Sequence, residues 1–244
     1  MIGPEESGES AIRVGVAVPA AGSGLRMGGT RKAFMELDGE PLLMRALRPF
    51  LNDHRVVTVV VSLAPEDADE VPGWITTLDD RVTLVKGGAT RTESVRNAVR
   101  VLPTDLDIIA IHDAARPLAG PDMYRNAVAL AREHGGALPA LPLRHVAGAA
   151  AATLQPTVVP GGLVRVQTPQ AFRATELWRA YRCAERDGFT GTDPSSCVEH
   201  YTDLEVRTFP GSATNLKVTY LRDVAVADLL LNARVGSGPT AAPR

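Results

Sequence analysis

The stretch from Val14 to Phe34, VGVAVPAAGSGLRMGGTRKAF, constrains the fold of this chain more than any other. It begins with valines at every second position, which is typical of a buried strand, and passes through Pro19 into a run of small residues. Glycines let backbone N–H groups approach an anion, and Arg26 and Lys32 supply charge that neutralises a polyphosphate. The stretch therefore predicts a strand followed by a phosphate-binding loop.

Two common glycine-rich loops fit this stretch poorly. The dinucleotide-binding fingerprint requires a glycine where Met27 stands, and no strand ends in an acidic residue about 20 residues further on. The spacing from Gly24 to Gly29 is that of a P-loop, but Thr30-Arg31 replaces the required Lys-Ser/Thr. A tight strand-to-helix turn with two surface cations remains as the purely structural alternative.

Composition restricts the class of protein. A chain of 244 residues with 45% hydrophobic residues can bury the core of one α/β domain, and a net charge of −2 gives no electrostatic footprint for nucleic acid or an anionic membrane. No apolar run approaches the roughly 18 residues of a membrane span, and the acidic start is unlike a signal peptide, so a cytoplasmic location is expected. Cys183 and Cys197 give no disulfide framework, and the scattered histidines predict no zinc site.

Lysine is rare in this chain. Of 26 basic residues, three are lysines, at positions 32, 86 and 217. Because arginine serves nearly everywhere else, each remaining lysine is a candidate for a site that needs a compact ammonium group.

Apolar periodicity predicts strands alternating with helices over residues 12–235. A polar segment at 1–11 and a Gly/Pro/Ala-rich tail at 236–244 are expected to be disordered. This alternation indicates an α/β fold with a doubly wound, mostly parallel, Rossmann-like sheet. The expected strands are 14–18, 56–63, 81–85, 106–111, 137–143, 164–167, 205–209 and 215–219. The expected helices are 41–51, 65–78 with an interruption at Pro72-Gly73, 90–102, 121–134, 175–187, a short one after Asp193, and 221–233.

Residues 144–162 break the pattern, because they carry little charge and are punctuated by proline and glycine. They do not fit a helix packed on the sheet. We expect a small protruding β-arm that contacts another subunit, which makes the protein a homodimer.

Two further loops follow predicted strands. Thr90 and Glu93 form a capping box after Gly87-Gly88, so that Arg91 and Ser94 can reach back from the first helical turn toward a base. An ordinary strand-to-helix turn explains this pattern as well.

At the end of strand 106–111 stand Asp113 and Arg116, where open α/β sheets bind ligands. This pair could hold substrate hydroxyls or lie near a metal. Taken alone, it could also be a structural salt bridge.

Five motifs in this order, AAGSGLRM followed by Lys32, GGATRTESV, HDAARP, TPQAF and NLKVT, resemble the 2-C-methyl-D-erythritol 4-phosphate cytidylyltransferase family. The resemblance covers roughly residues 12–233 and implies a nucleotidyltransferase that couples CTP to a polyol phosphate and releases pyrophosphate. It also implies Mg²⁺, bound mainly through the phosphates of CTP rather than by protein ligands.

The resemblance assigns roles to individual residues. Those matching the catalytic cations are Arg26, Lys32 and Lys217. Those matching the CTP contacts are Ala20, Ala21, Gly22, Gly88, Arg91 and Ser94. Those matching the substrate side are Asp113, Arg116 and Thr168.

The chain departs from the family mainly on the acceptor side. His145-Val146-Ala147-Gly148 replaces the usual Asp-Thr-Ile-Lys, Pro160 stands where an arginine is expected, and Arg31 stands where a proline usually precedes the lysine. The first hypothesis is the methylerythritol-phosphate cytidylyltransferase itself. The alternatives are a cytidylyltransferase for another polyol phosphate, such as ribitol 5-phosphate, and a non-catalytic nucleotide-binding paralogue.

Overall fold

The strands assemble into an eight-stranded sheet with the order β10-β7-β11-β6-β1-β4-β5 and β12 paired to β7, among the residues that the structure describes. The computed structural model describes residues 12–22, 31–143, 147–150, 153–156, 162–191 and 193–236. The strands of this sheet are β1 (Val14–Ala20), β4 (Val56–Leu63), β5 (Val82–Lys86), β6 (Ile108–Ile111), β7 (Gly136–Leu143), β10 (Leu163–Val166), β11 (Gln170–Arg173) and β12 (Val206–Pro210). Two small hairpins pair β2 (Glu36–Leu37) with β3 (Glu40–Pro41) and β8 (Ala147–Ala150) with β9 (Thr153–Pro156).

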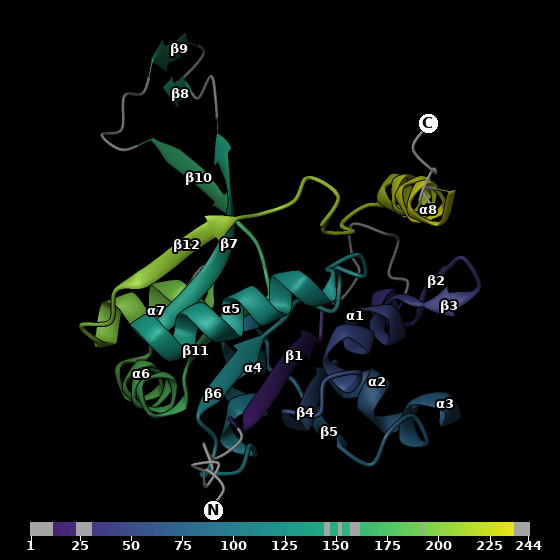
Figure 1. Cartoon of the computed structure of the whole chain (residues 1–244), viewed down its shortest axis with the longest axis horizontal. Coiled ribbons are helices and arrows are strands. Elements are labelled where there is room, and N and C mark those ends of the chain that lie inside the picture. The colour runs from purple at the N-terminus through teal and green to yellow at the C-terminus, as the bar shows by residue number, and fades with distance from the viewer. Residues whose placement is uncertain are drawn as a thin grey trace, which may run out of the picture.

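Helices cover both faces of the sheet (Figure 1). They are the 3-10 turn η2 (Lys32–Phe34), α1 (Leu42–Leu51), α2 (Pro65–Asp69), α3 (Gly73–Thr76), α4 (Arg91–Arg100), α5 (Pro121–His134), α6 (Ala174–Asp187), α7 (Pro194–Tyr201) and α8 (Leu221–Gly236). Alternation along β1 shows how the layers form. Val16 and Val18 belong to the core that α1 and α5 cover, whereas Ala17 belongs to the core beneath α4 and α6.

The central strands run parallel, which brings their carboxyl ends to one edge. β1 pairs with β4 and β6 in parallel, and β4 pairs with β5 in the same sense. β11 lies antiparallel between β6 and β7, while β12 is parallel to β7. The prediction of a mostly parallel α/β sheet is confirmed.

Most expected elements are present, but one expected strand is absent and one strand of the main sheet was not expected. Residues 215–219 form no strand: Val218 is buried, and its N–H donates to the carbonyl of Ala115 (2.8 Å), so this segment packs as a loop across the end of the sheet. Conversely, strand β11 was missed, because four residues between Pro169 and a helix carry too little periodic signal. The helix expected over 65–78 with an interruption at Pro72-Gly73 is present as α2 and α3, which are separated before Gly73 as expected.

The segment expected to be an arm contains the β8–β9 hairpin, which extends away from the main sheet beyond β7 and β10 (Figure 1). Contact with another subunit stays a prediction. The disorder expected at 1–11 concerns residues outside the described part of the chain, as does that at 237–244. Gly236, which was counted with the tail, ends α8.

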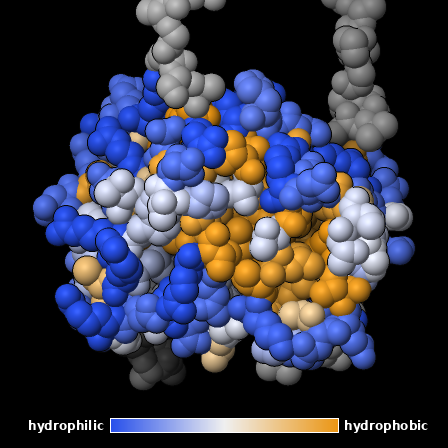
Figure 2. All heavy atoms as spheres, turned by 90° about the horizontal axis from the view of Figure 1, so that it is seen from below, coloured by the Kyte–Doolittle hydropathy of each residue, from blue (hydrophilic) through white to orange (hydrophobic). Residues whose placement is uncertain are grey.

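No helix of the described chain is both long and apolar enough to cross a bilayer. Apolar surface does reach the outside: Figure 2 shows hydrophobic residues gathered on the face turned downward in Figure 1, with hydrophilic residues around them.

Replacing Phe172 tests the importance of the strand that the sequence did not reveal. This side chain is fully buried in β11, opposite Ile109 of β6 and Gly136 of β7. Phe172→Ala should therefore lower the free energy of unfolding by about 3–5 kcal/mol, measured by urea denaturation. Val101→Ala, at a half-exposed position, should change it by less than about 0.5 kcal/mol. Similar losses for the two variants would contradict the packing described here.

Candidate active site

A pocket of about 370 Å³ opens at the carboxyl ends of β1, β5 and β6. Such an edge, where strand order reverses around β1, is the usual ligand site of open α/β sheets. The lining comes from four segments: the end of β1, η2, the turn between β5 and α4, and the loop after β6, with Lys217 added from the segment before α8. The residues are Pro19, Ala20, Ala21, Gly22, Lys32, Ala33, Gly88, Ala89, Thr90, Arg91, Ser94, Asp113, Ala114, Ala115 and Lys217.

The turn between β5 and α4 forms one wall and is fixed by its own hydrogen bonds. Thr90 and Glu93 make the predicted capping box, and the N–H of Gly88 donates to Ser94 Oγ (3.1 Å). A Cβ on Gly88 would lie 2.3 Å from Cβ of Glu93, and one on Gly87 would lie 2.4 Å from Cβ of Ala21. The second contact shows that this turn touches the end of β1, so only glycines allow the two walls to approach so closely.

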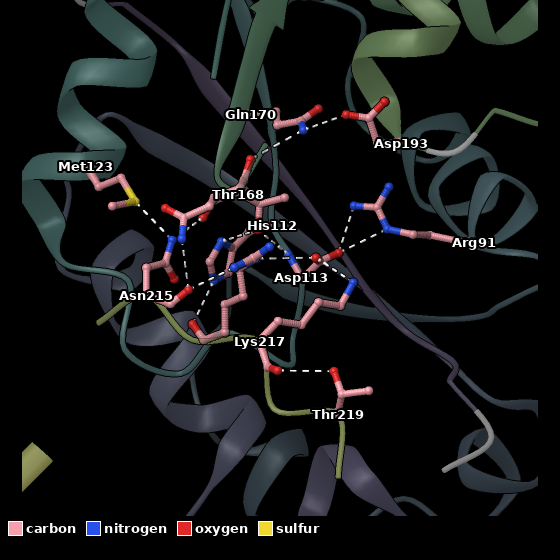
Figure 3. Close-up of polar contacts among 12 residues, drawn as sticks. Arg91, His112, Asp113, Met123, Thr168, Gln170, Asp193, Asn215, Lys217 and Thr219 are labelled. Atoms are coloured by element: carbon pink, nitrogen blue, oxygen red, sulfur yellow. Dashed lines mark hydrogen bonds and ion pairs between the residues drawn. The ribbon is translucent and has the colours of Figure 1, made fainter. Parts of the chain in front are cut away.

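Asp113 is the electrostatic centre of the site (Figure 3). Its Oδ1 accepts hydrogen bonds from Nε (3.0 Å) and Nη2 (2.7 Å) of Arg91, in the first turn of α4. Its Oδ2 lies 2.9 Å from Nζ of Lys217 and 3.5 Å from Nε of Arg116. Three cations from three segments therefore surround one carboxylate.

The charges around Asp113 do not cancel. Burial would raise the pKa of the Asp113 carboxyl, but the charges of Arg91, Lys217 and Arg116 outweigh burial and hold that pKa far below its usual range. The carboxylate is thus ionised, and three cations around one anion leave a net positive charge. Because Lys217 and Arg91 also line the pocket, this excess suits an anionic ligand.

A buried hydrogen-bond chain holds Asp113 from behind. The N–H of Asp113 donates to Thr168 Oγ1 (3.0 Å), which is 3.1 Å from His112 Nδ1, while His112 Nε2 is 3.2 Å from the carbonyl of Arg116. Since a carbonyl only accepts, Nε2 carries the proton, and Nδ1 accepts from the Thr168 hydroxyl. Burial lowers the pKa of His112 to about 4, so the ring is neutral at physiological pH.

The segment carrying Lys217 is fastened beside this chain. Asn215 Nδ2 donates to the carbonyl of Thr168 (3.0 Å), and the carbonyl of Asn215 accepts from Arg116 Nη1 (2.8 Å). Asn215 is almost fully buried. The loop therefore brings Lys217 to Asp113, and Figure 3 shows its side chain rising to the carboxylate from the segment below, while Arg91 reaches it from α4.

Comparisons with known proteins agree with this geometry. The family model described as 2-C-methyl-D-erythritol 4-phosphate cytidylyltransferase matches residues 14–233. This chain belongs to that family. A protein of that name from Solibacter usitatus is 40% identical over 235 residues, which cover 90% of this chain and 96% of that one. A second, from Acidobacterium capsulatum, is 35% identical and covers 91% of this chain and 99% of its own.

Solved structures support the same assignment. The 2-C-methyl-D-erythritol 4-phosphate cytidylyltransferase of Thermus thermophilus superposes with a TM-score of 0.74 at 26% identity, covering 88% of this chain and 98% of that one. The resemblance to the cytidylyltransferase family stated from the five motifs is confirmed.

The structure brings together most residues that the cytidylyltransferase motifs predicted. Those lining the pocket are Ala20, Ala21, Gly22, Lys32, Gly88, Arg91, Ser94, Asp113 and Lys217. Arg116 and Thr168 lie directly behind Asp113, where both are almost fully buried. Arg26 lies outside the described residues. The individual roles stay predictions.

Sequence reasoning gave no role to His112, Gln170 or Asn215. All three stand within motifs that pointed to the family, but the linear sequence does not show their contacts: His112 and Asn215 both contact Thr168, and Gln170 contacts Asp193. Gln170 donates to Asp193 Oδ2 (2.9 Å) and accepts from the N–H of Ser195 (3.1 Å), which ties β11 to the start of α7.

The pH dependence of stability should report the ion cluster around Asp113. Its pKa is lowered in the folded state, so its contribution to stability is present above the unfolded value of about 3.9 and is lost as pH falls below it. Asp113→Asn should therefore reduce the free energy of unfolding at pH 7, and the difference from the parent protein should shrink on acidification toward pH 3. Urea denaturation across this range measures it, and a difference independent of pH would contradict the cluster.

Proposed function

We propose that this chain transfers the cytidylyl group of CTP to the phosphate of 2-C-methyl-D-erythritol 4-phosphate and releases pyrophosphate. The observation that carries the proposal is the positive cluster around Asp113, which opens into the same pocket as the Gly88 turn and the end of β1. The family of the chain supplies the substrates, since its model and its relatives bear the name of this reaction.

The reaction asks mainly for alignment and charge neutralisation. A phosphate oxygen of the acceptor attacks the α-phosphorus of CTP, the new P–O bond forms, and the bond to the β-phosphate oxygen breaks with its electron pair leaving on pyrophosphate. Little covalent chemistry is required of the protein, so cations placed at the developing charge determine the rate. Lys32 and Lys217 line the pocket and are assigned this role, together with Arg26.

CTP is assigned to the wall formed by the end of β1 and the turn after β5. Residues 20–22 line the pocket and are assigned backbone contacts to the phosphates, and Gly88 and Ser94, which also line it, are assigned to the base. A side chain on Gly88 would collide with Glu93, so the glycine preserves the capping box that shapes this wall.

The acceptor is assigned to the side of Asp113 and Arg116, with Thr168 beside them. The acceptor-side departures at 145–148 and 160 favour testing ribitol 5-phosphate as a second candidate. A non-catalytic paralogue is disfavoured, because Lys32, Asp113 and Lys217 all converge on one pocket. We place the reaction in the cytoplasm.

Magnesium fits this site as a partner of CTP rather than of the protein. No group of three or more His, Cys, Asp or Glu side chains in the described chain could hold a metal ion, and Asp113 is already surrounded by three cations. Mg²⁺ is usually bound through substrate phosphates with few protein ligands. When bound to CTP it would neutralise phosphate charge, and the lysines act on the charge that remains.

Pyrophosphate release measures the proposed activity. With CTP and Mg²⁺, the protein should turn over 2-C-methyl-D-erythritol 4-phosphate, and Lys32→Ala and Lys217→Ala should each lower kcat by about 10²–10³ because a cation at developing charge is lost. Arg207→Ala, an exposed cation on β12, is the matched control and should keep the parent rate. Addition of EDTA should abolish turnover.

The acceptor decides between the candidates. Ribitol 5-phosphate is assayed beside 2-C-methyl-D-erythritol 4-phosphate at the same concentrations. Turnover of ribitol 5-phosphate alone would transfer the assignment to the second candidate. No turnover of either, with CTP still bound in calorimetry, would point to another acceptor or to the non-catalytic paralogue.

We further propose that the protein is a homodimer joined through the arm at 144–162. The β8–β9 hairpin supports this, because it extends from the sheet and pairs with itself rather than with the core. Light scattering of the full chain should give about twice 25.9 kDa. A variant in which a short glycine-serine turn replaces residues 147–156 should be monomeric, and a monomeric parent protein would refute the proposal.

A further inference from the structure

We infer that Arg31 is a positioning residue that fixes Lys32 at the mouth of the pocket by tying η2 to α2. The inference rests on the proposed function, because it assigns Arg31 a role through a lysine that the proposal places at the phosphates. Arg31 itself does not line the pocket, whereas Lys32 and Ala33 do.

The turn that carries Lys32 has little stability of its own. η2 is a single 3-10 turn of three residues without a side-chain cap, closed by bonds from the N–H of Phe34 to the carbonyl of Arg31 (3.0 Å) and from Met35 to Lys32 (3.2 Å). Isolated turns of this length do not persist in water, so tertiary contacts must determine where Lys32 lies.

The side chain of Arg31 supplies such contacts toward α2. Its Nε donates to Asp67 Oδ1, and its Nη2 donates to the carbonyl of Glu70 (2.8 Å). Asp67 belongs to α2, and its side chain is only 7% exposed. Removing Arg31 would leave the buried Asp67 carboxylate without its charged partner, which costs more than losing one partner of a fully exposed salt bridge.

An aromatic contact fixes the other side of the turn. The guanidinium carbon of Arg31 lies 4.8 Å from the centroid of the Phe34 ring, which in turn meets Trp74 of α3 edge to face at 6.2 Å. A cation over a ring and an edge-to-face pair both have preferred geometries. Arg31 therefore links both ends of η2 to α2 and α3.

The helix α2, to which Arg31 is bonded, is connected to the wall of the pocket. α2 follows β4 directly, and the carbonyl of Leu63, the last residue of β4, accepts from the N–H of Gly87 (2.7 Å) in the base-side turn. Arg31 thus fixes Lys32 relative to α2 and β4, and β4 is bonded to the turn after β5 that lines the nucleotide pocket. A displacement of about 1 Å at a reacting group can cost about 10²-fold in rate, so loosening this anchor should reduce turnover without removing any charge from the pocket.

The experiment measures kcat, the KM for CTP and the melting temperature of Arg31→Ala, Asp67→Asn and Arg31→Lys. Arg31→Ala and Asp67→Asn should each lower kcat tenfold or more and change the KM by less than about threefold, because charge stays in place while alignment is lost. Arg31→Lys keeps the pair with Asp67 and should recover part of the loss. The double variant Arg31→Ala with Asp67→Asn should lose no more than either single one.

Arg55→Ala is the matched control. Arg55 also pairs with a carboxylate that is 9% exposed, Asp53, but it lies in the loop that precedes β4, at the other end of the strand. It should lower the melting temperature comparably and leave kcat unchanged. If Arg31→Ala has a kcat within twofold of Arg55→Ala, or loses activity only in proportion to unfolded protein, the inference is wrong.

Lys32→Ala separates this inference from the proposed function. An inactive Lys32→Ala beside an unaffected Arg31→Ala would overturn the anchoring role and leave the cytidylyltransferase assignment intact. A fully active Lys32→Ala would overturn the role of the lysine and, with it, that of Arg31.

Discussion

The buried carboxylate of Asp113 stays ionised only because three cations surround it, and removing any of them would leave its charge poorly compensated. Most of the site follows from this constraint. Asp113 is only 6% exposed, so its charge is tolerated because Arg91, Arg116 and Lys217 offset its desolvation. These cations come from α4, from the loop after β6 and from the segment before α8. The carboxylate therefore joins segments of the chain as far apart in the sequence as Arg91 and Lys217.

The cluster also explains why buried uncharged groups surround it. Thr168, neutral His112 and Asn215 supply hydrogen bonds without adding charge. They hold the N–H of Asp113, the carbonyl of Arg116 and the guanidinium of Arg116, respectively, while the net positive charge stays at the pocket. A protonated His112 would add a fourth cation beside the cluster. Burial prevents that by keeping the pKa of its ring near 4. The polar layer behind the pocket thus keeps its charge constant across the physiological range.

Local patterns predicted what depends on local physics. The capping box at Thr90 and the alternation along β1 were read correctly, because each is determined by neighbours in sequence. The segment at 215–219 was misread as a strand. Val218 is buried because the segment packs as a loop against the residues after β6, where its N–H donates to the carbonyl of Ala115, and a contact so distant in the sequence leaves no local pattern. β11 was missed because its partners, β6 and β7, lie far away in the sequence. The roles of the site residues came from the motif resemblance, and the contacts among Asp113, His112 and Thr168 could not be read from sequence at all.

Arg31 and Arg91 show how one residue type serves two purposes in this site. Both pair with buried carboxylates, but the partner of Arg91 is at the pocket, whereas that of Arg31 is on α2, outside it. A planar guanidinium can bind a carboxylate and a second acceptor, or an aromatic ring, at once, which suits it to fixing two segments together. A lysine offers a compact charge on a flexible stem and fixes little by itself. Lys32 therefore depends on Arg31 to hold it in place, and Lys217 depends on Asn215 and Asp113. The chain has only one other lysine, which is consistent with lysine being used where a compact charge is needed and arginine where two segments are fixed together.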